Sequence, residues 1–137
     1  MSNLPKNLIV KIAEEVHSGL AVFVHKQTHE LATYVADEGY LVPEDVDYQK
    51  VQQNPNDYFQ IKAMDSNEAY SLREKFIETV TDKALQADLK SCLKSKYKFQ
   101  NFKHHVRNSE YEQQWFDFEA NAQIEYVQWQ LKTLSSN

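Results

Sequence analysis

The sequence predicts an α+β fold in a single domain spanning residues 1–137. Two glycines and three prolines in 137 residues are too few for the many turns of a β-sandwich or barrel. Apolar residues recur with helical spacing over most of the chain, and three short segments show strand-like composition. A chain of this length commonly forms one domain, and it is long enough to bury a core.

The N-terminal part is expected to contain a helix followed by a small antiparallel sheet. Pro5 suits the first turn of a helix over residues 5–17, and Gly19 stands where a left-handed residue would end that helix. A β-hairpin and a third strand are then predicted by β-branched and aromatic residues and by period-2 alternation. The three strand segments are 20–24, 30–36 and 58–63.

The remainder of the chain predicts a C-terminal layer of about four helices. Asp65 with Glu68, and Ser109 with Glu112, have the spacing of capping boxes, which predicts that helices begin at these two points. Two shorter helices are expected between them. The last helix is predicted to be the longest and to run to about Leu134.

The last helix has apolar residues on two faces, which a helix needs when it packs on both sides. An aliphatic stripe lies about 140° around the helix from an aromatic stripe. The helix is either the central helix of its own domain or it presents the aromatic stripe to a partner, including a second copy. The members of this candidate interaction face are Tyr111, Trp115, Phe118, Tyr126 and Trp129.

The formal charge of −5 includes three strongly charged blocks, which together sum to −4. Residues 37–57 carry a net −5, residues 90–107 carry +6 and residues 110–125 carry −5. The middle block is expected to be a solvent-exposed helix face, whose charge is balanced by an acidic partner or by the chain's own residues 37–57. The alternative is a nucleic-acid surface, although the overall acidity of the chain repels phosphate. The candidate basic patch comprises Lys94, Lys96, Lys98, Lys103 and Arg107.

The residue pattern marks no catalytic or metal centre. His25 and His29 flank a turn, but two histidines lack the further ligands that zinc needs. Cys92 keeps register with neighbouring leucines, which predicts a buried, inert thiol. We therefore expect no catalytic residue, no metal and no cofactor. The lone cysteine and the lack of an export signal predict the cytoplasm, and no apolar run reaches the ~20 residues of a membrane helix.

Four blocks of sequence resemble the bacterial uncharacterised protein family 0158, over about residues 8–134. They are Asp57-Tyr-Phe-Gln-Ile61, Phe99-Gln-Asn-Phe-Lys103, Trp115-Phe-Asp-Phe118 and Ile124-Glu-Tyr-Val127. The resemblance implies the fold but supplies no activity. Gln100 stands where relatives often have a basic residue, so no anion-binding role is transferred. His104 replaces a common acid, and His29 a common turn glycine, which predicts a left-handed backbone at His29.

These observations favour a non-enzymatic cytoplasmic binding or adaptor protein that acts through protein–protein contacts. Its partner is another protein or a second copy of the chain, in a homodimer through the last helix. A nucleic-acid-associated regulator that uses residues 90–107 is the alternative. An enzyme comes third, because it would require acidic and histidine side chains from separate segments to meet in one pocket.

Overall fold

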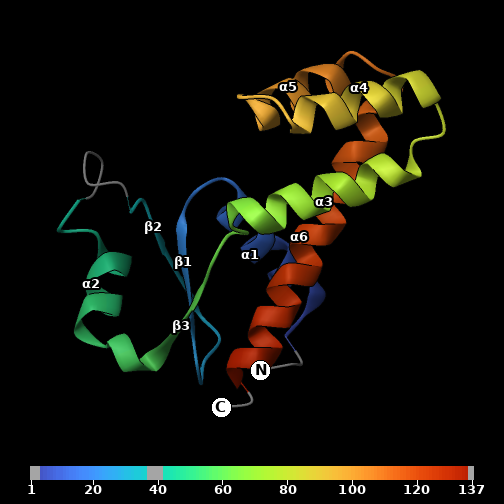
Figure 1. Cartoon of the computed structure of the whole chain (residues 1–137). Helices are drawn as coiled ribbons and strands as arrows, with labels where there is room; N and C mark the ends of the chain where they lie inside the picture. The colour runs from blue at the N-terminus through green and yellow to red at the C-terminus, as the bar shows by residue number, and fades with distance from the viewer. Residues whose placement is uncertain (1–3, 37–41, 136–137) are drawn as a thin grey trace. The chain divides into compact units, whose positions relative to one another are not determined.

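The computed structural model describes residues 4–36 and 42–135, and its contacts divide the chain into two compact units (Figure 1). The sheet unit comprises Met1–Ala63 and Gln123–Asn137, and the helical unit comprises Met64–Ala122. An N-terminal helix, a three-stranded antiparallel sheet and several C-terminal helices confirm the α+β class. The assignment of both units to one domain stays a prediction.

The first helix, α1, spans Lys6–His17, close to the predicted 5–17, and Pro5 is its N-cap and not part of its first turn. Its C-terminal end is closed by the two backbone hydrogen bonds of a Schellman motif. The Gly19 amide donates to the Val16 carbonyl at 3.0 Å, and the Leu20 amide donates to the Glu15 carbonyl at 3.2 Å. Gly19 has a φ of +99°, so the left-handed end predicted there is confirmed.

The sheet consists of β1 (Ala21–His25), β2 (Leu31–Tyr34) and β3 (Tyr58–Ile61), in the order β2-β1-β3. Both pairings are antiparallel, which confirms the predicted hairpin and third strand. Val22 in the central strand lies opposite Thr33 on one side and Ile61 on the other. In the hairpin turn His29 has a φ of +64°, which confirms the predicted left-handed residue.

Helix α2 (Val46–Gln53) and the short 3₁₀ helix η1 (Pro55–Asp57) lie in the acidic segment, where we predicted no helix. Val51 is the buried residue of α2, so its apolar periodicity is too weak to detect. Asp45 caps α2 by accepting a hydrogen bond from the Tyr48 amide at 3.0 Å. Residues 37–41, which belong to the acidic block 37–57, lie outside the described residues.

Side chains from helices satisfy the backbone at both outer strands of the sheet. The Thr33 amide of β2 donates to the Asp47 carboxylate of α2 at 3.0 Å. Beyond β3, the Gln130 amide group binds both backbone groups of Lys62: Oε1 accepts from its N–H at 2.8 Å and Nε2 donates to its C=O at 2.9 Å. Gln130 thus makes the two hydrogen bonds that a neighbouring strand residue would make.

The helical unit contains α3 (Ser66–Thr79), α4 (Lys83–Leu93), α5 (Lys98–Arg107) and the first part of α6 (Glu112–Ser135). The capping box of Asp65 and Glu68 is confirmed. The predicted box at Ser109 is wrong. Its hydroxyl instead accepts from the Tyr111 amide at 3.1 Å and donates to the Val106 carbonyl at 2.7 Å, so Ser109 closes the turn after α5.

Helix α6 contributes to both hydrophobic cores, but with different halves and different faces. Its first half places the aromatic stripe, including Trp115 and Phe118, against the core of the helical unit. Its second half places the aliphatic stripe, including Val127 and Leu131, in the core of the sheet unit. Each apolar stripe is therefore buried along only part of the helix. Within the described ranges, no helix is long and apolar enough to cross a membrane.

Candidate functional site

Three members of the predicted interaction face pack inside the helical unit. Trp115 is only 3% exposed, and its ring lies 5.2 Å from that of Phe76 and 5.0 Å from that of Phe102. Tyr111 and Phe118 are partly buried against the same core. All three side chains thus contribute to one hydrophobic core or pack against it.

The other two members, Tyr126 and Trp129, lie on the part of α6 that belongs to the sheet unit. Their rings are stacked with centroids 5.7 Å apart. Trp129 is 58% exposed, which is high for a residue with so large an apolar surface. An interaction role for this half of the stripe stays a prediction.

Three of the five residues of the predicted basic patch do not line the pocket that the other two, Lys103 and Arg107, share. Lys94 caps the end of α4. Lys96 lies 5.5 Å from the ring of Tyr97, and Lys98 lies 5.3 Å from the ring of Tyr70. Long basic side chains commonly cover aromatic rings in this way while their charges stay in water.

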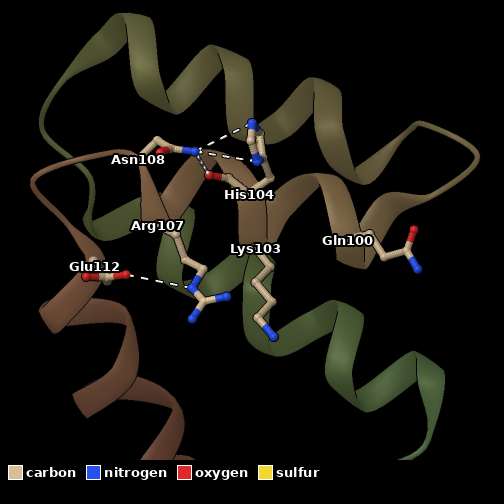
Figure 2. Close-up of a pocket in the computed structure, with 6 residues that line it drawn as sticks. All are labelled: Gln100, Lys103, His104, Arg107, Asn108 and Glu112. Carbon is tan, nitrogen blue, oxygen red and sulfur yellow. Dashed lines mark hydrogen bonds and ion pairs between the residues drawn. The ribbon is translucent and has the colours of Figure 1, made fainter.

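Lys103 and Arg107 do share a pocket, which is shown in Figure 2. It is a surface pocket of about 610 Å³ along the exposed face of α5. The lining positions on α5 are three or four residues apart, so they are neighbours on the surface of the helix. Asn108 and Glu112 complete the wall beyond the end of α5. The residues of this α5 pocket are Gln100, Lys103, His104, Arg107, Asn108 and Glu112.

The α5 pocket has a small positive charge. Lys103 and Arg107 contribute two positive charges and Glu112 one negative charge, which leaves +1 with His104 neutral. Glu112 lies 3.8 Å from the Arg107 guanidinium, and both side chains are about half exposed. In Figure 2 Lys103 and Arg107 extend to the same side of α5, away from His104 and Asn108. The side-chain amide of Asn108 donates from Nδ2 to the His104 carbonyl at 2.8 Å, and this bond closes the C-terminal end of α5.

The sequence pointed to this pocket only in part. The basic block identified Lys103 and Arg107, and Gln100 was noted only as a departure from the family pattern. His104 was noted as such a departure and, with His105, as a possible acid or base, the alternative being a partly buried helix histidine. The spacing of three and four residues between the pocket residues of α5 is the signal that groups them on one helix face. Glu112 comes from the next helix, so no periodicity within α5 could find it.

A partly buried cation, Arg73, packs against aromatic rings of the helical core. Its guanidinium lies 4.5 Å from the ring of Phe99 and 5.1 Å from that of Trp115, and an ion pair of 3.8 Å joins it to Glu119. Burial lowers the pKa of Arg73, and the Glu119 carboxylate opposes that shift. Arg73 also donates to the Ala69 carbonyl at 2.9 Å. This set of contacts holds α3, α5 and α6 together within the unit.

Cys92 is buried, at 6% exposure, as predicted from its register. Its Sγ lies 3.4 Å from Nδ1 of His105, and the same nitrogen lies 3.0 Å from the Asn101 carbonyl. Burial raises the pKa of the Cys92 thiol, and the Asp88 charge raises it further. The thiol is therefore neutral at physiological pH, which is the opposite of what a nucleophilic cysteine needs.

Cys92 is expected to make the stability of the helical unit fall at alkaline pH. Its folded pKa is raised, so its contribution is complete below the ordinary cysteine pKa of about 8.5 and is lost as pH rises through the folded pKa. Urea denaturation between about pH 7 and pH 10 measures this fall. Cys92→Ala should flatten the slope above pH ~8.5, and an unchanged slope would contradict the assignment.

Among the residues that the structure describes, no group of three or more His, Cys, Asp or Glu side chains is placed to hold a metal ion. The α5 pocket is lined by amides, cations, one imidazole and one carboxylate, and none of these is a hydroxyl or thiol nucleophile. Its chemistry is that of hydrogen bonding and charge pairing. Such a pocket suits recognition of a polar or acidic surface.

These features define a small α+β protein with a surface pocket along helix α5. A family model matches residues 26–135, and its description is Uncharacterised protein family (UPF0158). The match covers well over half of the chain, so this protein belongs to that family, which confirms the resemblance seen in the sequence. No curated protein and no solved structure gives a significant match.

Proposed function

We propose that this protein is a non-enzymatic binding or adaptor protein, acting in the cytoplasm, whose α5 pocket docks an acidic segment of a partner protein. The observation that carries the proposal is the pair of cations, Lys103 and Arg107, one helical turn apart on an exposed face. One turn, about 5.4 Å, is also the spacing of two carboxylates on a partner helix. Gln100 beside them offers an amide for further hydrogen bonds.

The charge of the α5 pocket favours a protein over a nucleic acid. Lys103 and Arg107 would neutralise at most two phosphates of a nucleic acid. Each phosphate contact contributes a slope of only about −0.9 in log K against log salt, so two contacts give weak binding at physiological salt. The three other lysines of the basic patch lie outside the pocket and do not extend it.

The proposal is tested by NMR titration of the full chain with two defined probes. The first probe is an alanine-rich helical peptide with two glutamates one turn apart, and the second is a single-stranded oligonucleotide. We expect the peptide to shift the amide signals of α5 around Lys103 and Arg107. Tighter binding of the oligonucleotide would overturn the proposal and support the nucleic-acid alternative.

Charge reversal identifies the pocket as the binding site. The double variant Lys103→Glu/Arg107→Glu should lower the affinity for the acidic peptide by about tenfold or more. Lys6→Glu/Lys11→Glu is the matched control, because it makes the same charge change on exposed positions of α1. An equal loss in both variants would show that only net charge matters, and the α5 pocket would not be the site.

A further inference from the structure

The second half of α6 has an exposed face centred on Trp129. Glu125 lies four residues before Trp129 and Lys132 lies three residues after it, and all three side chains are exposed. The three positions lie on one side of the helix, with Glu125 and Lys132 along the same edge. All of them belong to the sheet unit, so the face is formed within one compact body.

From this arrangement we propose that the face binds the same face of a second copy of the chain, with the two α6 helices antiparallel. A two-fold axis between positions 128 and 129 places Glu125 of each copy opposite Lys132 of the other. The face is therefore complementary to itself: one sequence supplies both charges of two symmetric ion pairs. A parallel pairing would instead place each charge beside its own kind.

Aromatic side chains occupy the centre of the proposed contact. The two-fold axis brings the two Trp129 rings together, and Tyr126 already stacks on Trp129 at 5.7 Å. Trp and Tyr are the residues that most often dominate interface energetics when their neighbours exclude water. The face covers only about three turns of helix, so the interface is small and the dissociation constant of the dimer should be micromolar or weaker.

Sedimentation velocity tests the proposal on the full chain from about 10 µM to about 1 mM. We expect the apparent mass to rise from 16.1 kDa toward twice that value as concentration increases. Trp129→Ala should shift the midpoint of this rise by about tenfold or more. Phe116→Ala is the control, because Phe116 is an exposed aromatic on the same helix outside the face, and it should leave the midpoint unchanged.

Charge exchange tests the antiparallel register. Glu125→Lys and Lys132→Glu should each weaken self-association, because each variant has like charges at both predicted pairs. An equimolar mixture of the two single variants should associate again, as should the double variant, because both restore opposite charges. A chain that is monomeric throughout the range, or a mixture that stays as weak as its components, would overturn the proposal. Neither result bears on the α5 pocket.

Discussion

Replacing Trp115 by alanine is expected to destabilise the helical unit by about 3–5 kcal/mol, the usual cost of removing a large buried aromatic side chain. The indole contacts Phe76, Phe102 and Phe118, with ring centroids between 5.0 and 6.4 Å apart. It also lies 5.1 Å from the Arg73 guanidinium. The cavity would therefore leave a partly buried cation with one ring fewer to cover it.

Urea denaturation followed by circular dichroism measures this loss, and amide hydrogen exchange locates it in α3, α4 and α5. The neighbouring substitution Phe116→Ala is the control. Phe116 is 39% exposed, so its truncation should cost less than about 1 kcal/mol. A small effect of Trp115→Ala would mean that this indole is accessible after all, and it would return Trp115 to the candidate interaction face.

Gln130→Leu is expected to destabilise the sheet unit by about 1–3 kcal/mol, although leucine is apolar and of similar size. Gln130 is only 7% exposed, and it makes hydrogen bonds to both the N–H and the C=O of Lys62. Leucine makes neither bond, so two backbone groups beside β3 lose their partners. The cost arises from these groups and not from lost packing.

Hydrogen exchange at the Lys62 amide is the specific measurement for Gln130. Exchange should accelerate in Gln130→Leu and stay closer to the wild-type rate in Gln130→Glu, which keeps an oxygen to accept from that N–H. Gln128→Leu is the control, because Gln128 is an exposed glutamine of the same helix. Equal protection of Lys62 in all variants would show that another group satisfies the amide.

The parts of the fold that were predictable from sequence depend on local chemistry. Gly19 was expected in a left-handed conformation, and Asp65 with Glu68 at a helix start, because each feature involves neighbouring residues only. The left-handed His29 was expected from the family resemblance, in which a glycine is common at that position. Helix α2 was missed because a single buried side chain gives no period. Ser109 was misplaced because a hydroxyl three residues before a glutamate also fits a turn between helices.

The candidate site was less predictable, because it depends on which charged side chains line the same pocket. The sequence grouped five cations by their proximity along the chain, but the aromatic rings of Tyr97 and Tyr70 lie beside Lys96 and Lys98. The two stripes of α6 were visible, but which half of each stripe is buried depends on the two separate cores. Neither fact can be read from helical spacing.

The division of α6 between two cores has a consequence for how the chain folds during synthesis. The helical unit is continuous in sequence, and the two segments of the sheet unit, Met1–Ala63 and Gln123–Asn137, flank it along the chain, so the second segment is synthesised after the helices. Until that part leaves the ribosome, the sheet lacks Val127 and Leu131 against its core, and Lys62 lacks the amide of Gln130. The nascent N-terminal segment therefore exposes apolar surface and a bare strand edge, which are features that chaperones bind, while the inserted helices can already fold.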